Sequence, residues 1–449
     1  MSTAPLTSPG PGAATGRAVY LSGLLGRPLA DQGGQPLGRL ADVIVRLRGA
    51  QYPLVTGLVA RVGRRQVFVP AGQLASFAVD ALRLASAKVD LRRFERRDGE
   101  VLLRADVLGH RLIDVGQARL VRAADLRLTR ADGDWVVDGV DTRHRARVLL
   151  RLPGHREPPP AAWDWRQFEP LIGHASSAAL RGPFAQIRRL KPAQIADLLE
   201  EASQAEGTEI LGHVHADPEL EADVFEELDE DLATRLLGAR TNTQIAAVLS
   251  RMGADDAADA IAELPQRRRQ GVLDLLPPGQ RTKVTTLMGF NPSSAGGLMS
   301  LDFLALPGSL AVADALAAVS KAAALQPEAL ATIHAVDQGG RLLGVARLVT
   351  LLQSDPGADL AQVCDTDPPR VGPDTDLTDV AVLMTDYNLA TIPVVDDSRR
   401  MLGLITVDDV LEVMLPGDWR RREAAVPPDA RHGDGPASGD RSGQPREGR

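Results

Sequence analysis

The sequence repeats itself internally at three different spacings, and these repeats constrain its fold more than any other feature. Residues 331–352 (ATIHAVDQGGRLLGVARLVTLL) align with residues 390–411 (ATIPVVDDSRRMLGLITVDDVL) at a constant offset of 59. Each copy predicts a strand, a turn, a second strand and the start of a helix, and an amphipathic segment typical of a helix precedes it. The C-terminal part of the chain is therefore expected to contain the same small α/β unit twice.

A second repeat, of 24 residues, lies upstream of these units. The segments that recur at this spacing are VFEEL (224–228), VLSRM (248–252) and VLDLL (272–276), with DLATRLL (231–237) and DDAADAI (255–261) between them. A unit of this length holds two short amphipathic helices, which bury their apolar faces only by stacking on neighbouring units. We therefore predict an α-helical superhelical domain over residues 184–290.

The third repeat occupies the N-terminal part, where residues 24–47 recur as residues 107–128 at an offset of 83. Both copies alternate apolar and polar residues around glycine-containing turns, as half-buried strands do. This pattern predicts two small β-barrels. It resembles a pair of PRC-barrel domains, which would occupy residues 17–90 and 100–152.

The two α/β units resemble a pair of CBS domains, and from Leu190 to Leu415 the chain resembles the cytosolic region of MgtE-type magnesium channels. LKPAQIADLLEEA (190–202), the helical repeats, SAGGLMSLDFLAL (294–306) and both CBS copies follow one another in that family's order. The resemblance implies CBS motif 1 over residues 295–355 and CBS motif 2 over residues 356–416. It also implies a homodimer that forms through the CBS domains.

Two further segments differ in composition from the rest of the chain. Residues 153–183 are rich in proline and read as a joint, and residues 423–449 are rich in Gly, Pro, Asp and Arg and predict a disordered tail. A membrane-spanning helix needs about 20 mostly apolar residues. The longest uncharged run, residues 284–301, contains Asn291, Pro292 and several glycines and serines. We therefore expect no transmembrane segment, and a soluble, cytoplasmic protein that lacks the pore of the MgtE channels.

Acidic residues supply the candidate metal site. Asp255 and Asp259 lie four residues apart and so share one helix face, where two carboxylates repel each other. Magnesium takes oxygen ligands, keeps several waters and uses one or two carboxylates per site, so Mg²⁺ between these residues and a second acidic surface would reverse that repulsion. The resemblance to MgtE implies that this surface belongs to the second CBS copy. The metal-ligand candidates are Asp255, Asp259, Asp374, Asp376 and Asp386.

A nucleotide site is predicted in the second CBS copy alone. Thr406 and Asp409 in GLITVDD match the CBS nucleotide motif, in which the aspartate accepts hydrogen bonds from ribose hydroxyls. The matching positions of the first copy hold Arg347 and Thr350, so that half-site is expected to be lost. The resemblance thus implies one adenine nucleotide, ATP, ADP or AMP, per CBS pair. The alternative interpretation is that Asp408 and Asp409 simply begin the helix VDDVLEVML.

Charge is distributed unevenly, with a net charge of +10 over residues 1–183 and −18 over residues 184–449. This asymmetry suggests either internal docking or an anionic partner for the basic front. Catalysis finds little support, because the sequence contains no glycine-rich phosphate loop, GxSxG elbow or HExxH motif. We therefore do not expect an enzyme.

These observations lead to one principal hypothesis and two alternatives. The principal hypothesis is a magnesium-sensing regulatory protein, modulated by an adenine nucleotide, in which Mg²⁺ bridges the helical domain and the CBS pair. The first alternative is an interaction protein whose basic PRC-type front binds RNA, the ribosome or anionic lipid. The second is a cytosolic component of a magnesium transport system that acts with a separate membrane subunit.

Overall fold

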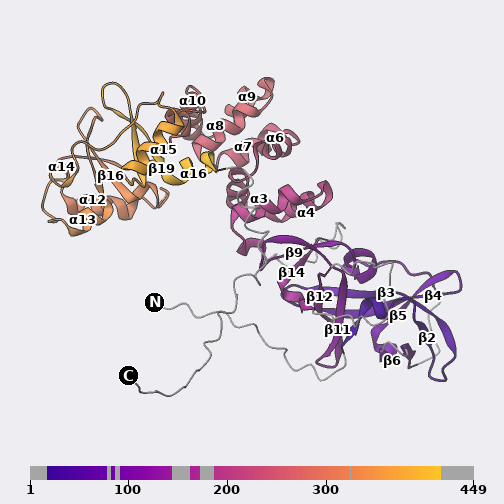
Figure 1. Cartoon of the computed structure of the whole chain (residues 1–449). Coiled ribbons are helices and arrows are strands. Elements are labelled where there is room, and N and C mark those ends of the chain that lie inside the picture. The colour runs from indigo at the N-terminus through magenta and orange to yellow at the C-terminus, as the bar shows by residue number, and fades with distance from the viewer. Residues whose placement is uncertain are drawn as a thin grey trace, which may run out of the picture. The chain divides into compact units, whose positions relative to one another are not determined.

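The computed structural model describes residues 18–77, 82–85, 92–143, 162–171, 187–323 and 325–415 (Figure 1). The chain divides into two compact units, Met1–Met252 and Gly253–Arg449. The predicted tail, residues 423–449, lies outside the described residues, and so does most of the proline-rich joint. Within the described ranges, no helix has the length and apolar character that crossing a bilayer requires.

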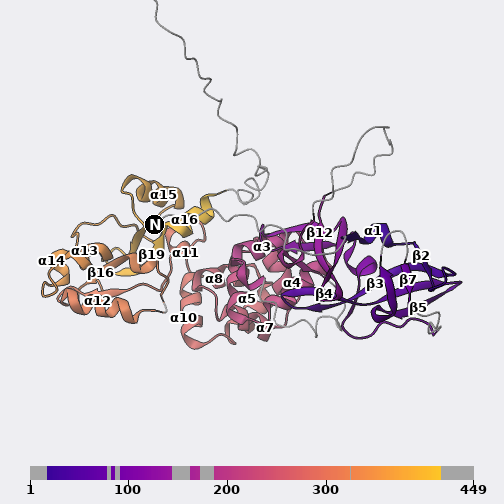
Figure 2. The same ribbon diagram turned by 90° about the horizontal axis from the view of Figure 1, so that it is seen from below.

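The first unit begins with a curled eleven-stranded sheet that contains strands from both copies of the 83-residue repeat (Figures 1 and 2). Its main path runs β1-β11-β12-β4-β3-β2-β7-β6, with β13 added to β12, β5 to β4 and β8 to β3. The strands are β1 (Val19–Tyr20), β2 (Pro28–Ala30), β3 (Pro36–Arg48), β4 (Gln51–Val62), β5 (Arg65–Pro70), β6 (Leu74–Phe77), β7 (Leu82–Leu84), β8 (Glu100–Leu102), β11 (Asp125–Ala131), β12 (Asp134–Asp141) and β13 (Trp163–Asp164). A separate three-stranded sheet contains β10 (Arg119–Arg122), β9 (Arg111–Asp114) and β14 (Phe168–Pro170) in that order.

The two copies of this repeat exchange equivalent parts with each other. Strand β1 of the first copy pairs with β11 of the second, and β8, at the start of the second copy, pairs with β3 of the first. The Asp42 carboxylate accepts the backbone N–H groups of Arg104 and Ala105, in the single helical turn Leu103–Val107 (η2). Its repeat equivalent, Asp125, accepts the backbone N–H of Ser22 in the short helix α1 (Leu21–Leu24). Each copy therefore caps the first helical turn of the other.

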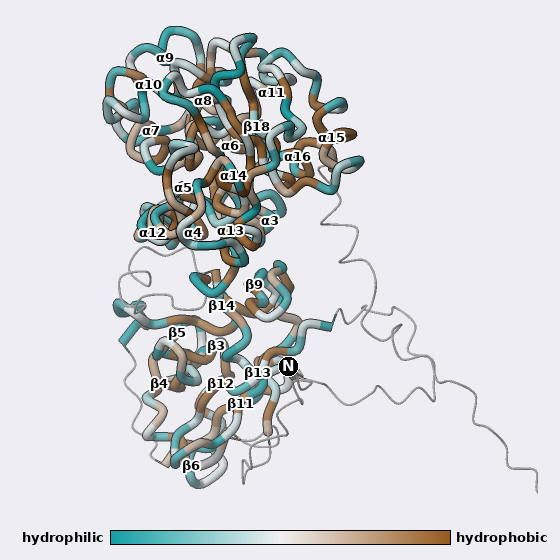
Figure 3. The backbone as a smooth tube through the Cα atoms, turned by 90° about the vertical axis from the view of Figure 1, so that its left-hand side faces the viewer, coloured by the Kyte–Doolittle hydropathy of each residue, from teal (hydrophilic) through white to brown (hydrophobic). Residues whose placement is uncertain are grey.

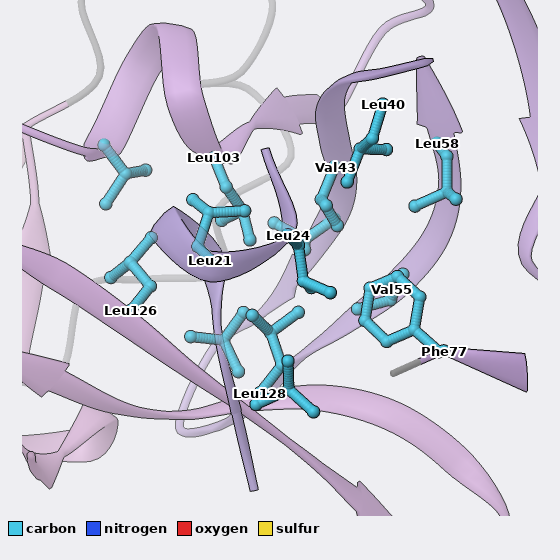
Figure 4. Close-up of a cluster of buried hydrophobic side chains, with 14 of the residues drawn as sticks. Leu21, Leu24, Leu40, Val43, Val55, Leu58, Phe77, Leu103, Leu126 and Leu128 are labelled. Carbon is cyan, nitrogen blue, oxygen red and sulfur yellow. The ribbon is translucent and has the colours of Figure 1, made fainter. Parts of the chain in front are cut away.

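One hydrophobic core serves both copies. Figure 4 shows Leu21 and Leu24 of the first copy packed among side chains that include Leu103, Leu126 and Leu128 of the second. The predicted strands are present, but they do not form two separate small barrels. The physical reason is the exchange itself, because each copy pairs with a strand of the other and both contribute to one sheet.

The helices of the 24-residue repeat begin at the spacing that the sequence predicts. Helices α5 (Pro218–Glu226), α7 (Asn242–Leu249) and α9 (Gln266–Leu273) form one series, and α6 (Glu230–Gly238), α8 (Ala254–Glu263) and α10 (Pro278–Leu287) form the other. In each series the first residues lie 24 positions apart. Helices α3 (Pro192–Glu201) and α4 (Gln204–Val214) precede them in the first unit. Helices α8, α9 and α10 belong to the second unit, in which α8 packs on α9 and α10.

The rest of the second unit holds the two α/β copies. The first contains β15 (Ala305–Pro307), α12 (Val312–Lys321), η5 (Ala329–Ala331), β16 (Thr332–Val336), β17 (Leu342–Arg347) and α13 (Leu348–Gln353). The second contains α14 (Leu360–Val363), α15 (Leu377–Asp386), β18 (Thr391–Val395), β19 (Met401–Thr406) and α16 (Val407–Met414). The predicted pair of CBS-like units is thus present.

These two copies also exchange their entry segments. Ser300, which precedes the first copy, forms two backbone hydrogen bonds with Leu404 in β19 of the second. Asp365, which precedes the strands of the second copy, forms the same two bonds with Val345 in β17 of the first. Because the exchange is reciprocal, the pair has a local two-fold symmetry, and neither copy is complete without the other.

Candidate functional site

The candidate site is centred on the N-terminal end of helix α8. Gly253 precedes this helix and brings the backbone close to its first turn, because a Cβ atom on Gly253 would lie 2.8 Å from the Asp255 carboxylate. The apolar residues Ala254, Ala257, Ala258 and Ile261 bury one side of the helix. Asp255 is half-buried as a result, whereas Asp259, one turn later, is exposed.

Asp255 lies close enough to Asp409 of the second CBS copy for the two carboxylates to repel each other. Burial raises the pKa of Asp255 to about 6, and repulsion from Asp409 and Asp259 adds to the increase. Burial also raises the pKa of Asp409. The second unit thus places two partly desolvated carboxylates within range of electrostatic repulsion, one from α8 and one from the start of α16.

Thr406 and Asp409 form a capping box at the start of α16. The Thr406 hydroxyl accepts the Asp409 N–H at 3.3 Å, and Asp409 Oδ2 accepts the Thr406 N–H at 2.8 Å. This arrangement satisfies two N–H groups at the helix start and fixes the direction of the Asp409 side chain. Only one of its carboxylate oxygens takes part in these bonds. At the same place in the first copy, Arg347 precedes α13 and makes no side-chain cap hydrogen bond.

Asp374 and Asp376 lie on the loop that leads into α15, and the segment SAGGLM holds this loop in place. The backbone N–H groups of Ala295 and Gly296 donate to the carbonyls of Thr375 and Pro373, both at 2.8 Å. Glycine is required at position 296, since a Cβ atom there would lie 2.7 Å from the Phe290 ring. The short helix α11 (Ala295–Leu298) therefore positions the loop that carries both aspartates.

The predicted metal ligands of the second CBS copy do not gather at one point. Asp376 is the N-cap of α15, and a hydrogen bond from the Thr378 N–H lowers its pKa. Asp386 is the last residue of the same helix, ten residues further on, so the two lie about 15 Å apart along the axis. They cannot ligate one ion. Across the described part of the chain, no three His, Cys, Asp or Glu side chains lie together in a way that could hold a metal.

Sequence reasoning assigned Asp409 to a nucleotide and missed its proximity to Asp255. The signal that could have found it is the pair Asp408–Asp409 at a helix start, which offers a second acidic partner for DDAAD. Sequence reasoning also gave no role to His334 on β16. This residue is fully buried, and its Nε2 has no hydrogen-bond partner within the described structure.

Comparison with protein families identifies two regions of the chain. Residues 190–293 match the MgtE intracellular N domain, and residues 360–416 match the CBS domain. The magnesium transporter MgtE of Thermus thermophilus is 37% identical over 163 residues, which is 36% of this chain and 36% of the transporter. The MgtE of Bacillus subtilis is 23% identical over 229 residues, or 51% of this chain and 50% of that protein. The chain thus spans between about a third and a half of the length of these relatives.

Solved structures give similar matches. The cytosolic domain of the Mg²⁺ channel MgtE in complex with ATP is 29% identical, with a TM-score of 0.48, and the match covers 51% of this chain and 92% of that domain. The soluble part of a magnesium transporter is 23% identical, with a TM-score of 0.47, over 54% of this chain and 91% of that structure. Together with the family matches, the sequence comparisons show that this chain contains an MgtE intracellular N domain at residues 190–293, followed by CBS sequence at residues 360–416.

Proposed function

We propose that this chain is a magnesium-sensing regulatory module in which Mg²⁺ binds between α8 and the start of α16. The observation that carries the proposal is the electrostatic repulsion between the partly desolvated carboxylates of Asp255 and Asp409. Two carboxylates that are partly desolvated and repel each other favour either a proton or a cation between them. At neutral pH the proton is largely lost, because the pKa of Asp255 is about 6. A divalent cation is then the stronger partner.

The donor set suits magnesium. Both candidate ligands are carboxylate oxygens, and Mg²⁺ is commonly held by one or two carboxylates while it keeps several waters. Asp255 and Asp409 would hold the ion, and the exposed Asp259, one turn along α8, would add charge close by. Asp374, Asp376 and Asp386 remain candidate ligands for further ions on the surface of the second CBS copy.

The bound ion would join the N domain to the CBS pair. Without it, repulsion between Asp255 and Asp409 opposes the closed arrangement of α8 and α16. With it, attraction to both carboxylates favours that arrangement, so the balance between closed and open forms would follow the Mg²⁺ concentration. This proposal concerns the sensing module only.

Calorimetric titration of the whole chain with Mg²⁺ at pH 7.5 tests the proposal. The parent should bind Mg²⁺, whereas Asp255→Asn and Asp409→Asn should each weaken binding at least tenfold, because each removes one of two charged ligands. Asp379→Asn is the matched control, since Asp379 is an exposed carboxylate on α15 that lies outside the proposed site. Equal affinities for the parent and Asp255→Asn would refute the site.

An adenine nucleotide remains the proposed modulator, and Thr406 and Asp409 remain its candidate contacts. The same carboxylate would then face both the ribose and the metal, so nucleotide and Mg²⁺ would affect each other's binding. Titration with ATP at zero and at saturating Mg²⁺ would measure this coupling. Identical ATP affinities in the two titrations would show that Asp409 does not serve both ligands.

We also propose that the chain forms a homodimer through its CBS pair. Helices α13 and α16 occupy equivalent places in the two copies and expose equivalent leucines, Leu352 at 65% and Leu411 at 47%. Much of α15 and α16 is hydrophobic (Figure 3), and Val382, Val413 and Met414 are also exposed there. An apolar surface with two-fold symmetry suits an isologous contact. Light scattering should give twice the chain mass for the parent and a monomer for Leu352→Glu with Leu411→Glu.

A further inference from the structure

The β-sheet part of the chain, residues 18–143, buries six of its acidic side chains. Each of its buried carboxylates accepts a hydrogen bond from a backbone N–H. These residues are Asp42, Glu100, Asp106, Asp114, Asp125 and Asp141. In contrast, none of the described arginines in this part is buried. These buried acids serve the fold, so the surface of this part is more basic than its net charge suggests, although other carboxylates, such as Glu95 and Asp98, are exposed near the arginines.

The arginines are concentrated around the hairpin between β4 and β5. Arg39 on β3 lies directly opposite Arg61 on β4, and the next residue across the sheet is Gln66 on β5. Arg64 and Arg65 follow Gly63, which has a φ of +61° and forms the tight turn. Arg93 pairs through its backbone with Val67 of β5. Because Arg65 is paired with Val62 and Arg93 with Val67, these two arginines lie on the opposite face of the sheet from Arg39 and Arg61. We name the exposed arginines on the two sides of this hairpin the hairpin patch: Arg39, Arg61, Arg64, Arg65 and Arg93.

The positive charge of the hairpin patch is not neutralised by any ion pair within the described part of the chain. Among the described residues, no carboxylate forms an ion pair with any of the five arginines. Two like charges directly opposite each other on neighbouring strands are destabilising. This arrangement is favourable when an anion lies across both side chains. Arg97, whose guanidinium stacks at 4.8 Å over the ring of Phe68 on β5, extends the basic surface.

The chemistry of the hairpin patch favours a chain of phosphates. Guanidinium groups bind phosphate oxygens in a bidentate geometry, and several of them around one hairpin can contact successive phosphates of a nucleic-acid backbone. Docking to a bilayer commonly adds apolar side chains that insert between lipids. Within the described residues of 18–143, no large hydrophobic side chain is strongly exposed. We propose that the hairpin patch binds the phosphate backbone of a nucleic acid.

The test measures binding of the full chain to a fluorescent 20-base-pair RNA duplex of arbitrary sequence. If about five phosphates are contacted, the affinity should fall by about 10²–10³-fold between 50 and 200 mM salt. The sequence of the duplex should matter little, because the contacts are to the backbone. Vesicles that contain phosphatidylglycerol serve as the competing anionic surface.

Two variants with the same net charge locate the binding surface. Arg64→Gln with Arg65→Gln removes two arginines of the hairpin patch and should weaken RNA binding at least tenfold at 100 mM salt. Arg46→Gln with Arg130→Gln removes two exposed arginines elsewhere, and Arg46 lies about 20 Å along β3 from Arg39. This control should change the affinity less than threefold.

Three results would overturn the proposal. The first is no binding of the parent to the duplex at 50 mM salt. The second is an equal loss in both variants, which would indicate a general effect of net charge. The third is vesicle binding that depends on Arg64 and Arg65 and is not displaced by RNA, which would assign the hairpin patch to a membrane surface.

Discussion

The hydroxyl oxygens of Thr332 and Thr391 lie 2.6 Å apart, although 59 residues separate them in the chain. Both residues begin the first central strand of their CBS copy, so the contact joins equivalent atoms and lies on the local two-fold axis. At the other end of these strands, two equivalent backbone bonds also join the copies, from the Leu342 N–H to the Arg399 carbonyl and from the Met401 N–H to the Gly340 carbonyl. The pair is thus held together at its axis by polar contacts.

Replacing one of these threonines by valine should destabilise the CBS pair. Both side chains are buried, so the remaining hydroxyl would lose its partner at a cost of about 1–3 kcal/mol. The double variant, Thr332→Val with Thr391→Val, should lose clearly less free energy of unfolding than the two single variants together, because it leaves no hydroxyl unpaired. Urea unfolding of the three variants at pH 7 measures both quantities. Strictly additive effects would show that the hydroxyl contact contributes nothing.

Local periodicity allowed much of this architecture to be predicted from sequence. The starts of α5, α7 and α9 follow the 24-residue spacing, and β16 and β18 follow the offset of 59. The exchange of strands could not be predicted, since a half-buried strand has the same alternation whichever copy it pairs with. For this reason the offset of 83 makes Asp42 and Asp125 repeat equivalents but does not show that each caps the opposite copy.

The candidate site was only partly predictable for a similar reason. The spacing of Asp255 and Asp259 is a property of one helix, and sequence shows it directly. The electrostatic interaction between Asp255 and Asp409, in contrast, depends on where the fold places α8 relative to α16. The buried state of His334 was also unpredictable, because its equivalent in the second copy is Pro393 and the repeat gives no reason for a histidine there.

Asp255→Asn should stabilise the metal-free protein at pH 7. The pKa of Asp255 is about 6 in the folded chain and near 3.8 when unfolded, so the folded state holds its proton more tightly. Stability therefore falls as pH rises from about 4 to 6, by up to about 3 kcal/mol. Asparagine removes the repelling charge and should recover part of this loss. Thermal unfolding in EDTA should show a higher Tm for the variant at pH 7 and no difference at pH 3.5.

At saturating Mg²⁺ the parent should have a higher Tm than Asp255→Asn, the reverse of the order in EDTA. The parent gains the free energy of binding, whereas Asp255→Asn has lost a ligand and should gain much less. If Mg²⁺ raises the Tm of both proteins equally, Asp255 is not a ligand, whatever its effect on the metal-free protein.

His334 should make the second unit sensitive to mild acid. Burial lowers the pKa of this histidine to about 4, from about 6.5 in the unfolded chain. Between these values the unfolded state binds the extra proton, so stability is lost as pH falls from about 6.5 to 4, by about 3 kcal/mol in total. His334→Leu removes the titrating group and should flatten this part of the profile. Urea midpoints of parent and variant at pH 4.5, 5.5 and 7 provide the test, and parallel profiles would contradict it.

Arg111 should join the β-sheet part to the first helices of the N domain. Its guanidinium pairs with Glu206 on α4, with Nε at 2.9 Å from Oε1, and it donates from Nη1 to the Glu201 carbonyl at 3.1 Å. Burial alone would raise the pKa of Glu206, but hydrogen bonds from Arg111 and Ser203 outweigh it and lower the pKa to about 2. The contribution of the Arg111–Glu206 ion pair to folding stability is therefore complete above about pH 4.5 and is lost as pH falls towards 2.

Arg111→Ala should loosen this contact while both parts stay folded. The ion pair is partly exposed, so we expect a loss of about 1 kcal/mol, together with faster hydrogen exchange in β9, β10 and α4. Arg119→Ala is the matched control, because Arg119 lies on the neighbouring strand and its guanidinium is 4.0 Å from Asp114, within the β-sheet part itself. It should leave exchange in α4 unchanged. Equal exchange in α4 for Arg111→Ala and the parent would show that the ion pair does not hold the two parts together. Such a result would also remove the physical link by which a change in the N domain could reach the basic front.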